Sequence, residues 1–91
     1  MSYSYCVYVI ELDDPMVVYV GQSYLSPEER LKKHRSGVRS SRHVRNAKNP
    51  KLRPDLYQHL PKFESREAAL GAEEHHAKYL EGQGFTVEGG H

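Results

Sequence analysis

Two short segments rich in β-branched and aromatic residues lie close together near the N-terminus, and they constrain the fold most. Residues 5–12 are YCVYVIEL and residues 16–22 are MVVYVGQ, with only Asp-Asp-Pro between them. This composition favours β-strands, and so short a connection joins strands that run antiparallel. The sequence therefore predicts a β-hairpin, so that a sheet must form part of the fold.

Each predicted strand carries one tyrosine that deserves a functional hypothesis. Side chains alternate between the two faces of a strand, so Tyr8 and Tyr19 become cross-strand or diagonal neighbours if the register places them on the same face. The pattern leaves that register open. The alternative interpretation is that both rings are ordinary strand aromatics that pack the hairpin.

A helix with a clear start follows the hairpin. Ser26 is the expected N-cap, Pro27 suits the first helical position, and Glu29 completes a capping box three residues after the cap. We expect the helix to run to about Arg35 and to end near Gly37.

The remaining elements are predicted from pattern and from breaker residues. We expect a short helix at 41–47, a third strand at 56–63, a helix at 66–81 with Ser65 as its N-cap, and a short last strand at 85–87. Pro61 has no N–H, so it either confines the third strand to a sheet edge or is limited to the last residues of that strand. The chain of 91 residues is expected to form one domain over residues 1–91, an α+β fold with a three-stranded antiparallel sheet flanked by helices.

Charged residues on the predicted helices suggest a site. Arg30 and His34 lie one turn apart and share a face of the first helix, although both are alternatively ordinary solvent-facing residues. Glu73 lies on the apolar stripe of the last helix, where a carboxylate needs a basic partner such as Arg30, a divalent metal, or a structural salt bridge. That stripe is formed by Ala69, Leu70, Glu73, His76, Ala77 and Leu80.

Basic residues are concentrated in the middle of the chain. Residues 30–53 hold ten of the thirteen Lys and Arg residues and no Asp or Glu. Such a strip attracts phosphate backbones in a salt-dependent manner, and the alternative is a solvated surface. We expect contacts to a nucleic-acid backbone from Lys33, Arg35, Arg39, Arg42, Arg45, Lys48, Lys51 and Arg53.

Other classes of protein are not indicated. Cys6 is the only cysteine and can form neither an internal disulfide nor a metal-binding pair. No stretch approaches the roughly 18 apolar residues of a membrane span, and the first residues do not resemble a secretion signal. We expect a cytoplasmic protein that does not contact a membrane.

The ordered set of motifs resembles the GIY-YIG nuclease family. The tripeptides CVY at 6–8 and YVG at 19–21 are followed nine residues later by Arg30 and much later by a helical Glu73, and the resemblance covers essentially the whole chain. The first tripeptide departs from the family pattern, because Cys6 replaces Gly and the following Val replaces Ile.

The resemblance implies hydrolysis of DNA phosphodiester bonds with one divalent metal ion, Mg²⁺ or Mn²⁺. Glu73 would be its only direct protein ligand, and Arg30 would hold the scissile phosphate. Tyr8 would activate or orient the attacking water, Tyr19 would line the site, and His34 would accept the tyrosine proton. Since a phenol has a pKa of about 10, Tyr8 is a poor base unless its neighbours lower that value.

Two other functions compete with this hypothesis. One alternative is a nucleic-acid-binding module of the same fold without cleavage activity, which the departure at Cys6 favours. The other is a protein-binding adaptor, which would leave the basic strip without a function. For a nuclease without a separate recognition domain, specificity would come from the basic middle of the chain, from homodimerisation or from another protein.

Overall fold

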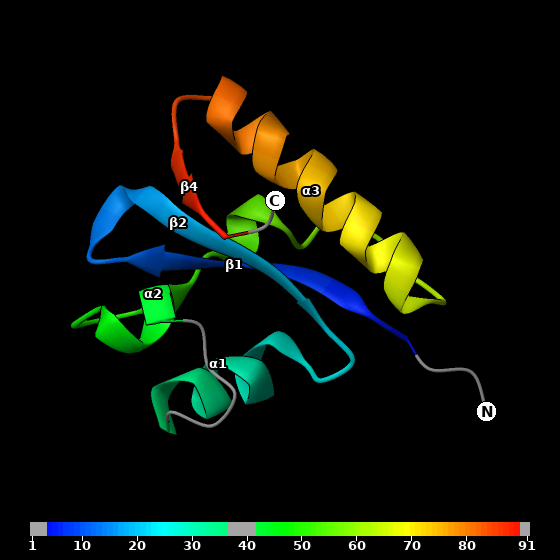
Figure 1. Ribbon diagram of the computed structural model, residues 1–91, viewed down its shortest axis with the longest axis horizontal. Coiled ribbons are helices and arrows are strands. Elements are labelled where there is room, and N and C mark those ends of the chain that lie inside the picture. Colours follow the sequence, from blue (N-terminus) through cyan, green and yellow to red (C-terminus); the bar gives the residue numbers. More distant parts are fainter. Residues whose placement is uncertain (1–3, 37–41, 90–91) are drawn as a thin grey trace.

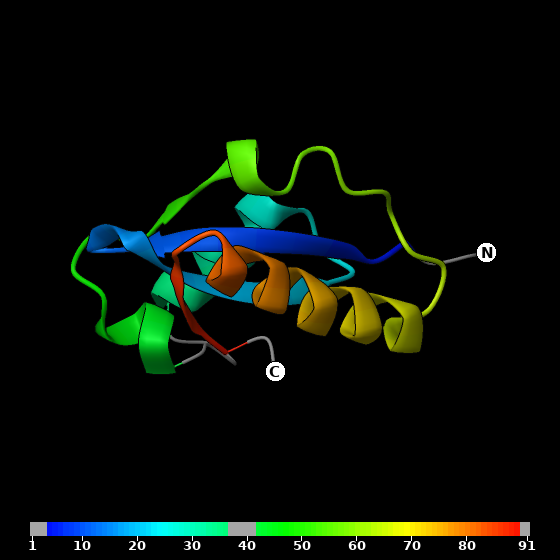
Figure 2. The same ribbon diagram turned by 90° about the horizontal axis from the view of Figure 1, so that it is seen from above.

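In the part of the chain that the structure describes, four strands form one sheet, with α3 on one side and α1 and α2 on the other (Figures 1 and 2). The computed structural model describes residues 4–36 and 42–89. The elements in chain order are β1 (Cys6–Leu12), β2 (Asp14–Ser23), α1 (Pro27–Ser36), α2 (Arg42–Asn46), β3 (Lys51–Leu52), the 3₁₀ helix η1 (Pro54–Leu56), α3 (Arg66–Gly82) and β4 (Thr86–Glu88).

The sheet is mixed, with the strand order β3-β1-β2-β4. β1 pairs with β2 and with β3 in antiparallel fashion, whereas β4 runs parallel to β2. The prediction of three antiparallel strands was therefore wrong in number and in direction. The reason is that α3 carries the chain back along the sheet, so that the strand after it starts beside the start of β2 (Figure 1).

The third strand was predicted in the wrong place. The strand that pairs with β1 at this edge is β3, at residues 51–52. Within the predicted range, residue 56 belongs to η1, and Phe63 makes only an isolated bridge with Tyr5. Two prolines remove backbone donors from residues 54–61. In the same stretch the N–H of Leu56 bonds locally to a carbonyl at 2.9 Å. A strand of two residues carries too little pattern to be predicted.

The predicted helix starts are confirmed by their caps. The hydroxyl of Ser26 accepts a hydrogen bond from the N–H of Glu29 at 3.2 Å, and the hydroxyl of Ser65 accepts one from the N–H of Ala68 at 3.1 Å. These bonds satisfy backbone donors that the helices leave unpaired. The predicted end at Gly37 lies outside the described residues.

The central hairpin is buried on both faces, which positions the site. Four valines on the face opposite Tyr8 are almost fully buried, and α3 packs against this hairpin through Ala77 and Leu80. Leu70 was predicted to face inward but is 41% exposed, so the apolar stripe of α3 is narrower than expected. The valines are Val7, Val9, Val18 and Val20.

Within the described ranges, no helix has the length and apolar character needed to cross a membrane.

Candidate active site

The register of the hairpin places both tyrosines on one face. Tyr8 lies opposite Gly21, and Tyr19 comes two residues before Gly21 on the same strand, so the two rings are diagonal neighbours. Their centroids are 6.3 Å apart. Gly21 leaves room for this arrangement, since a Cβ atom at its position would lie 2.6 Å from the hydroxyl oxygen of Tyr8.

We predict that Gly21→Ala destabilises the protein by about 1–3 kcal/mol, because the added methyl group overpacks the rigid ring of Tyr8. Gly71→Ala is the matched control, since a Cβ there meets nothing within 4 Å and Ala favours the helix interior by roughly 0.5–1 kcal/mol. Urea unfolding of both variants measures the difference. Equal stability of the two variants would contradict the close contact at Gly21.

Helix α1 brings a histidine and an arginine to the same face. His34 is completely buried, and its Nε2 lies 3.0 Å from the hydroxyl oxygen of Tyr8. Its ring also meets the ring of Tyr19 edge-on, with centroids 5.6 Å apart. Arg30 lies close enough to the same phenol for its charge and a side-chain hydrogen bond to lower the pKa of Tyr8 in part. His34 is therefore not a solvent-facing residue.

Tyr8, Tyr19, Arg30 and His34 form one cluster, in which the environment keeps Tyr8 and His34 neutral beside the charged Arg30. Burial raises the pKa of Tyr8, Tyr19 adds to the increase, and the nearby charge and hydrogen bond of Arg30 do not outweigh them. A pKa lowered by neighbouring groups was the condition for Tyr8 to be a good base, and the environment in this structure does not meet that condition. Burial, followed by the charge of Arg30, lowers the pKa of His34 to about 4. Near neutral pH, His34 is therefore a neutral imidazole, and in the tautomer whose proton lies on Nδ1 its Nε2 accepts a hydrogen bond from the phenol O–H.

His34 should make the protein lose stability in acid. Its pKa is about 4 in the folded chain and 6.5 ordinarily, so the unfolded state binds the proton first and stability falls as the pH decreases between these values. We expect His34→Gln, which keeps an acceptor for Tyr8 but does not titrate, to lose less stability over this range, by on the order of 1–3 kcal/mol.

Urea unfolding at several pH values across that interval measures the difference in slope. The control is His75→Gln on α3, the same substitution at a histidine whose side chain is exposed in the folded chain and lies outside the cluster. Parallel curves for wild type and His34→Gln would show that His34 is not held neutral by the fold.

Glu73 comes from α3, on the other side of the sheet from α1 (Figures 1 and 2). Its side chain is half-buried, burial raises the pKa of its carboxyl group, and the charge of Arg66 opposes this increase. Its negative charge also raises the pKa of Tyr8, so the two groups lie within electrostatic reach. The sequence suggested Arg30 as a basic partner of Glu73. The cation whose charge lowers the pKa of Glu73 is instead Arg66, two turns earlier on α3.

The donor set suits one hard cation that keeps much of its water. Across residues 4–36 and 42–89, no three His, Cys, Asp or Glu side chains gather as a metal-binding group. A single carboxylate such as Glu73 fits Mg²⁺, which usually binds through one or two carboxylates, water and substrate phosphate. A site for zinc, which needs three or four protein ligands, does not fit.

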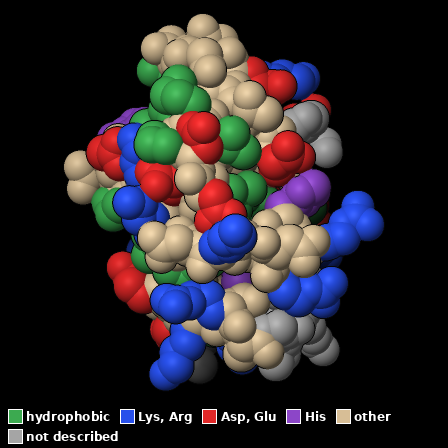
Figure 3. Space-filling model, turned by 90° about the vertical axis from the view of Figure 1, so that its left-hand side faces the viewer, with side chains coloured by type: hydrophobic (Ala, Val, Ile, Leu, Met, Phe, Trp, Pro, Cys, Tyr) green, Lys and Arg blue, Asp and Glu red, His purple; other side chains and the backbone are tan. Residues whose placement is uncertain are grey.

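The basic residues divide into two groups. The side chains on and near α1 and α2 are exposed, and Lys and Arg are frequent on this part of the surface (Figure 3). In contrast, Lys51 and Arg53 form ion pairs with Glu11 at 3.3 and 3.1 Å, and Arg53 also pairs with Asp55 at 2.9 Å. The exposed group comprises Lys33, Arg35, Arg42, Arg45 and Lys48, and Arg39 lies outside the described residues.

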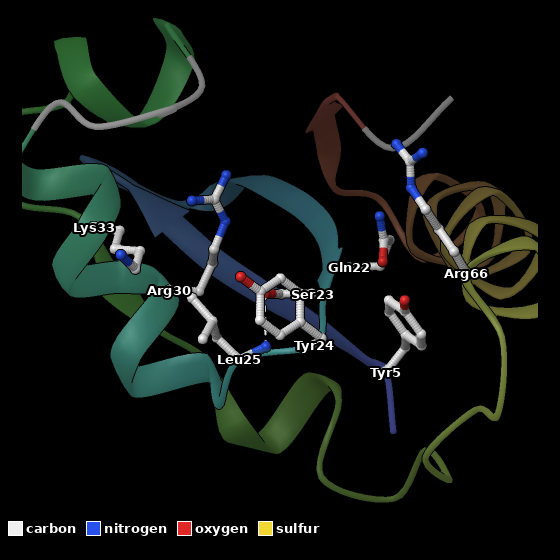
Figure 4. A pocket seen from close by; sticks show the side chains of 8 residues that line it. All are labelled: Tyr5, Gln22, Ser23, Tyr24, Leu25, Arg30, Lys33 and Arg66. Carbon is white, nitrogen blue, oxygen red and sulfur yellow. Dashed lines mark hydrogen bonds between the residues drawn. The ribbon is translucent and has the colours of Figure 1, made fainter. Parts of the chain in front are cut away.

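A hollow of about 670 Å³ opens beside the cluster (Figure 4). Arg30 belongs to both the hollow and the cluster. The other residues of interest around it were not singled out from the sequence: Tyr5, Gln22, Tyr24 and Arg66. The available signal was Tyr24, a large aromatic residue in the loop just after β2.

Comparison with known families decides the assignment. The family model of the GIY-YIG catalytic domain matches residues 4–83. The chain belongs to the GIY-YIG family. The family generally comprises endonucleases, so this GIY-YIG domain is of nuclease type. No curated protein and no solved structure matches the chain.

The departure from the family pattern at Cys6 has a structural role in this GIY-YIG domain. Its thiol donates a hydrogen bond to the carbonyl oxygen of Leu25 at 3.3 Å. A glycine has no side chain to make this bond. Cys6 therefore helps to fix the loop that connects β2 to α1.

Proposed function

We propose that this GIY-YIG domain is a metal-dependent endonuclease that hydrolyses DNA phosphodiester bonds. One observation carries the proposal: the hydroxyl of Tyr8 is hydrogen-bonded to a neutral His34 at 3.0 Å and is also contacted by Arg30. This arrangement joins a proton acceptor, a proton carrier and a phosphate-binding cation at one oxygen atom, as general base catalysis requires.

Tyr8 would act as a proton relay, because its raised pKa makes a free phenolate unfavourable. As the water oxygen bonds to phosphorus, its proton passes to the phenol oxygen and the phenol proton passes to Nε2 of His34. The bond from phosphorus to the leaving oxygen then breaks, and that oxygen takes a proton from solvent. The negative phosphate offsets the cost of placing a protonated His34 beside Arg30.

Arg30 would also control access to the relay. Tyr8 is only 1% exposed, so a water molecule reaches its oxygen only after a neighbouring side chain moves. Arg30 is a half-buried residue that acts on the Tyr8 phenol and also lines the adjoining hollow. A bound phosphate would attract this planar cation into a bidentate pair and so free the phenol oxygen.

Glu73 would hold the one Mg²⁺ or Mn²⁺ ion. When bound, such an ion supplies positive charge to the phosphate oxygens as the transition state forms. Because burial raises the pKa of Glu73, protons compete with the cation, and its binding should weaken as the pH falls. Tyr19 would line the site, where its ring packs against His34.

Contacts to the DNA backbone would come from the exposed basic side chains on and near α1 and α2. Phosphates bind such side chains without regard to sequence and with strong salt dependence. Lys51 and Arg53 would contribute less to DNA binding than the sequence suggests, because both are paired with Glu11. Glu11 is only 8% exposed, so releasing these two cations would leave a buried carboxylate without a partner, which is costly.

The second candidate is a nucleic-acid-binding module of the same fold that does not cut. The near-complete burial of Tyr8 favours it, because a covered phenol cannot contact water without a rearrangement. Incubating supercoiled plasmid with the protein and Mg²⁺ or Mn²⁺, with and without chelator, separates the two candidates. Metal-dependent nicking supports the nuclease, and salt-sensitive binding without nicking supports the module. Equal cleavage in chelator would contradict the metal mechanism.

A further inference from the structure

The hollow beside the cluster combines aromatic and cationic walls. Arg30 and Lys33 of α1 lie on one side of Tyr24, whereas Gln22, Tyr5 and Arg66 lie together on the other side (Figure 4). Its volume of about 670 Å³ falls within the range of roughly 300–1,000 Å³ that is typical of sites for small molecules. The hollow is therefore large enough for a ligand group of the size of a nucleotide.

Tyr24 presents its ring to solvent from a loop that is held in place. The side chain is 65% exposed, which leaves its large apolar surface without a role in the core. The loop around it is fixed by two side chains, since the hydroxyl of Ser23 accepts from the N–H of Leu25 at 3.0 Å and the thiol of Cys6 donates to the Leu25 carbonyl. A fixed, exposed ring is suited to stacking on a flat ligand.

The cations stand on both sides of this ring. Among the ion pairs of the described residues, none involves Lys33 or Arg66. Arg30 contacts the Tyr8 phenol, and the charge of Arg66 acts on Glu73. The hollow therefore adjoins the proposed catalytic groups at both ends, Tyr8 through Arg30 and Glu73 through Arg66. Successive phosphates of one strand would meet a cation on each side of Tyr24.

Gln22 supplies a polar group without a partner. Its Oε1 atom is buried and accepts no hydrogen bond from the described part of the chain. A buried amide oxygen without a donor is unfavourable, and turning this amide toward the hollow would let a bound group with an N–H remove that cost. The amino groups on base edges are donors of this kind.

We propose that the hollow binds one unpaired nucleotide next to the scissile phosphate, so that the substrate is a nucleic acid with a single-stranded segment, such as an overhang or a branch. This proposal deepens the proposed nuclease function and rests on it. The base stacks on Tyr24, its edge donates to Gln22, and the flanking phosphates pair with Lys33 and Arg66. In an uninterrupted duplex the bases stack on one another, so none is available to Tyr24.

Fluorescence anisotropy with labelled oligonucleotides, in chelator to prevent metal-dependent cleavage, tests this subsite. The probes are a blunt DNA duplex, the same duplex with a single-stranded overhang, and single strands of DNA and of RNA. We expect tighter binding to every probe with unpaired bases than to the blunt duplex. Tyr24→Ala should weaken these complexes about tenfold and the blunt complex by less than about twofold, because stacking on this ring contributes only to the former.

Two variants and one modified probe sharpen the test. Tyr24→Phe should bind as the wild type does, since a phenyl ring also stacks, and Tyr79→Ala should have no effect because this comparably exposed tyrosine (53%) lies on α3 outside the hollow. One abasic site next to the junction should weaken wild-type binding but cause no further loss in Tyr24→Ala. The RNA and DNA strands show which sugar the hollow accepts.

Two results would overturn the subsite: equal affinity of the wild type for blunt and overhang probes, or equal effects of Tyr24→Ala and Tyr79→Ala. Neither depends on cleavage. If Tyr24-dependent binding is found without cleavage, the subsite stands and the nuclease function fails. If cleavage is found but neither binding nor cleavage responds to Tyr24→Ala, the nuclease function stands and the subsite fails.

Discussion

Tyr8→Phe lowers the rate of plasmid nicking by a factor of about 10² to 10⁴, the range expected for loss of a general base. The substitution removes one oxygen atom and keeps the ring that fills the space above Gly21. It therefore breaks the relay to His34 and leaves the packing of the hairpin intact. Initial rates of conversion from supercoiled to nicked plasmid, measured at saturating Mg²⁺ or Mn²⁺, give the factor.

The variant should also be somewhat less stable. Nε2 of the buried His34 loses its donor, which costs about 1–3 kcal/mol, so rates must be compared at a temperature where circular dichroism shows that both proteins are folded. Tyr57→Phe is the matched control, because Tyr57 is also buried and burial raises its pKa to about 12, yet it is not part of the cluster. A rate for Tyr8→Phe within about threefold of that of Tyr57→Phe would remove Tyr8 from the mechanism.

Glu73→Gln abolishes most metal-dependent cleavage, with a loss of at least about 10²-fold, because the amide retains the shape but not the charge that attracts a divalent ion. The fold should not suffer, since the substitution replaces a half-buried carboxylate, whose pKa burial raises, with a neutral group. Isothermal titration with Mn²⁺ measures the loss of metal binding, and plasmid nicking measures the loss of cleavage.

Glu74→Gln provides a control on the neighbouring residue. Glu74 has an exposed side chain that pairs with Lys78 at 3.5 Å on the outer surface of α3. Removing this pair should leave cleavage within about twofold and change stability by less than about 1 kcal/mol. If both variants lose the same activity, the effect comes from the helix or its overall charge and not from a cation at Glu73.

The sequence predicts the parts of this structure that are specified locally. The strands around Tyr8 and Tyr19 follow from composition, and the helix starts at Ser26 and Ser65 follow from capping. The alternation of side chains then limits the two tyrosines to a few arrangements. Gly21 is the residue that selects among them, because only glycine leaves room for the ring of Tyr8 across the hairpin.

Features that depend on contacts between distant segments were not predictable. β3 has two residues and is positioned by β1, and the parallel direction of β4 depends on the path of α3. The pKa of Tyr8 depends on how deeply the helices bury it, which no local pattern reveals. The loss of Arg53 from the free basic surface likewise requires knowing that it meets Glu11, 42 residues away.

Tyr8 and His34 are hydrogen-bonded to each other within the buried interior, so the two residues that we propose for proton transfer also contribute to the stability of the fold. A related protein that does not cleave nucleic acid would still need Tyr8 and His34 in order to fold. It could lose Glu73, which is only half-buried, at a smaller cost in stability. Inactive relatives should therefore be recognised by the replacement of the glutamate on α3 and not by the replacement of the tyrosine on β1.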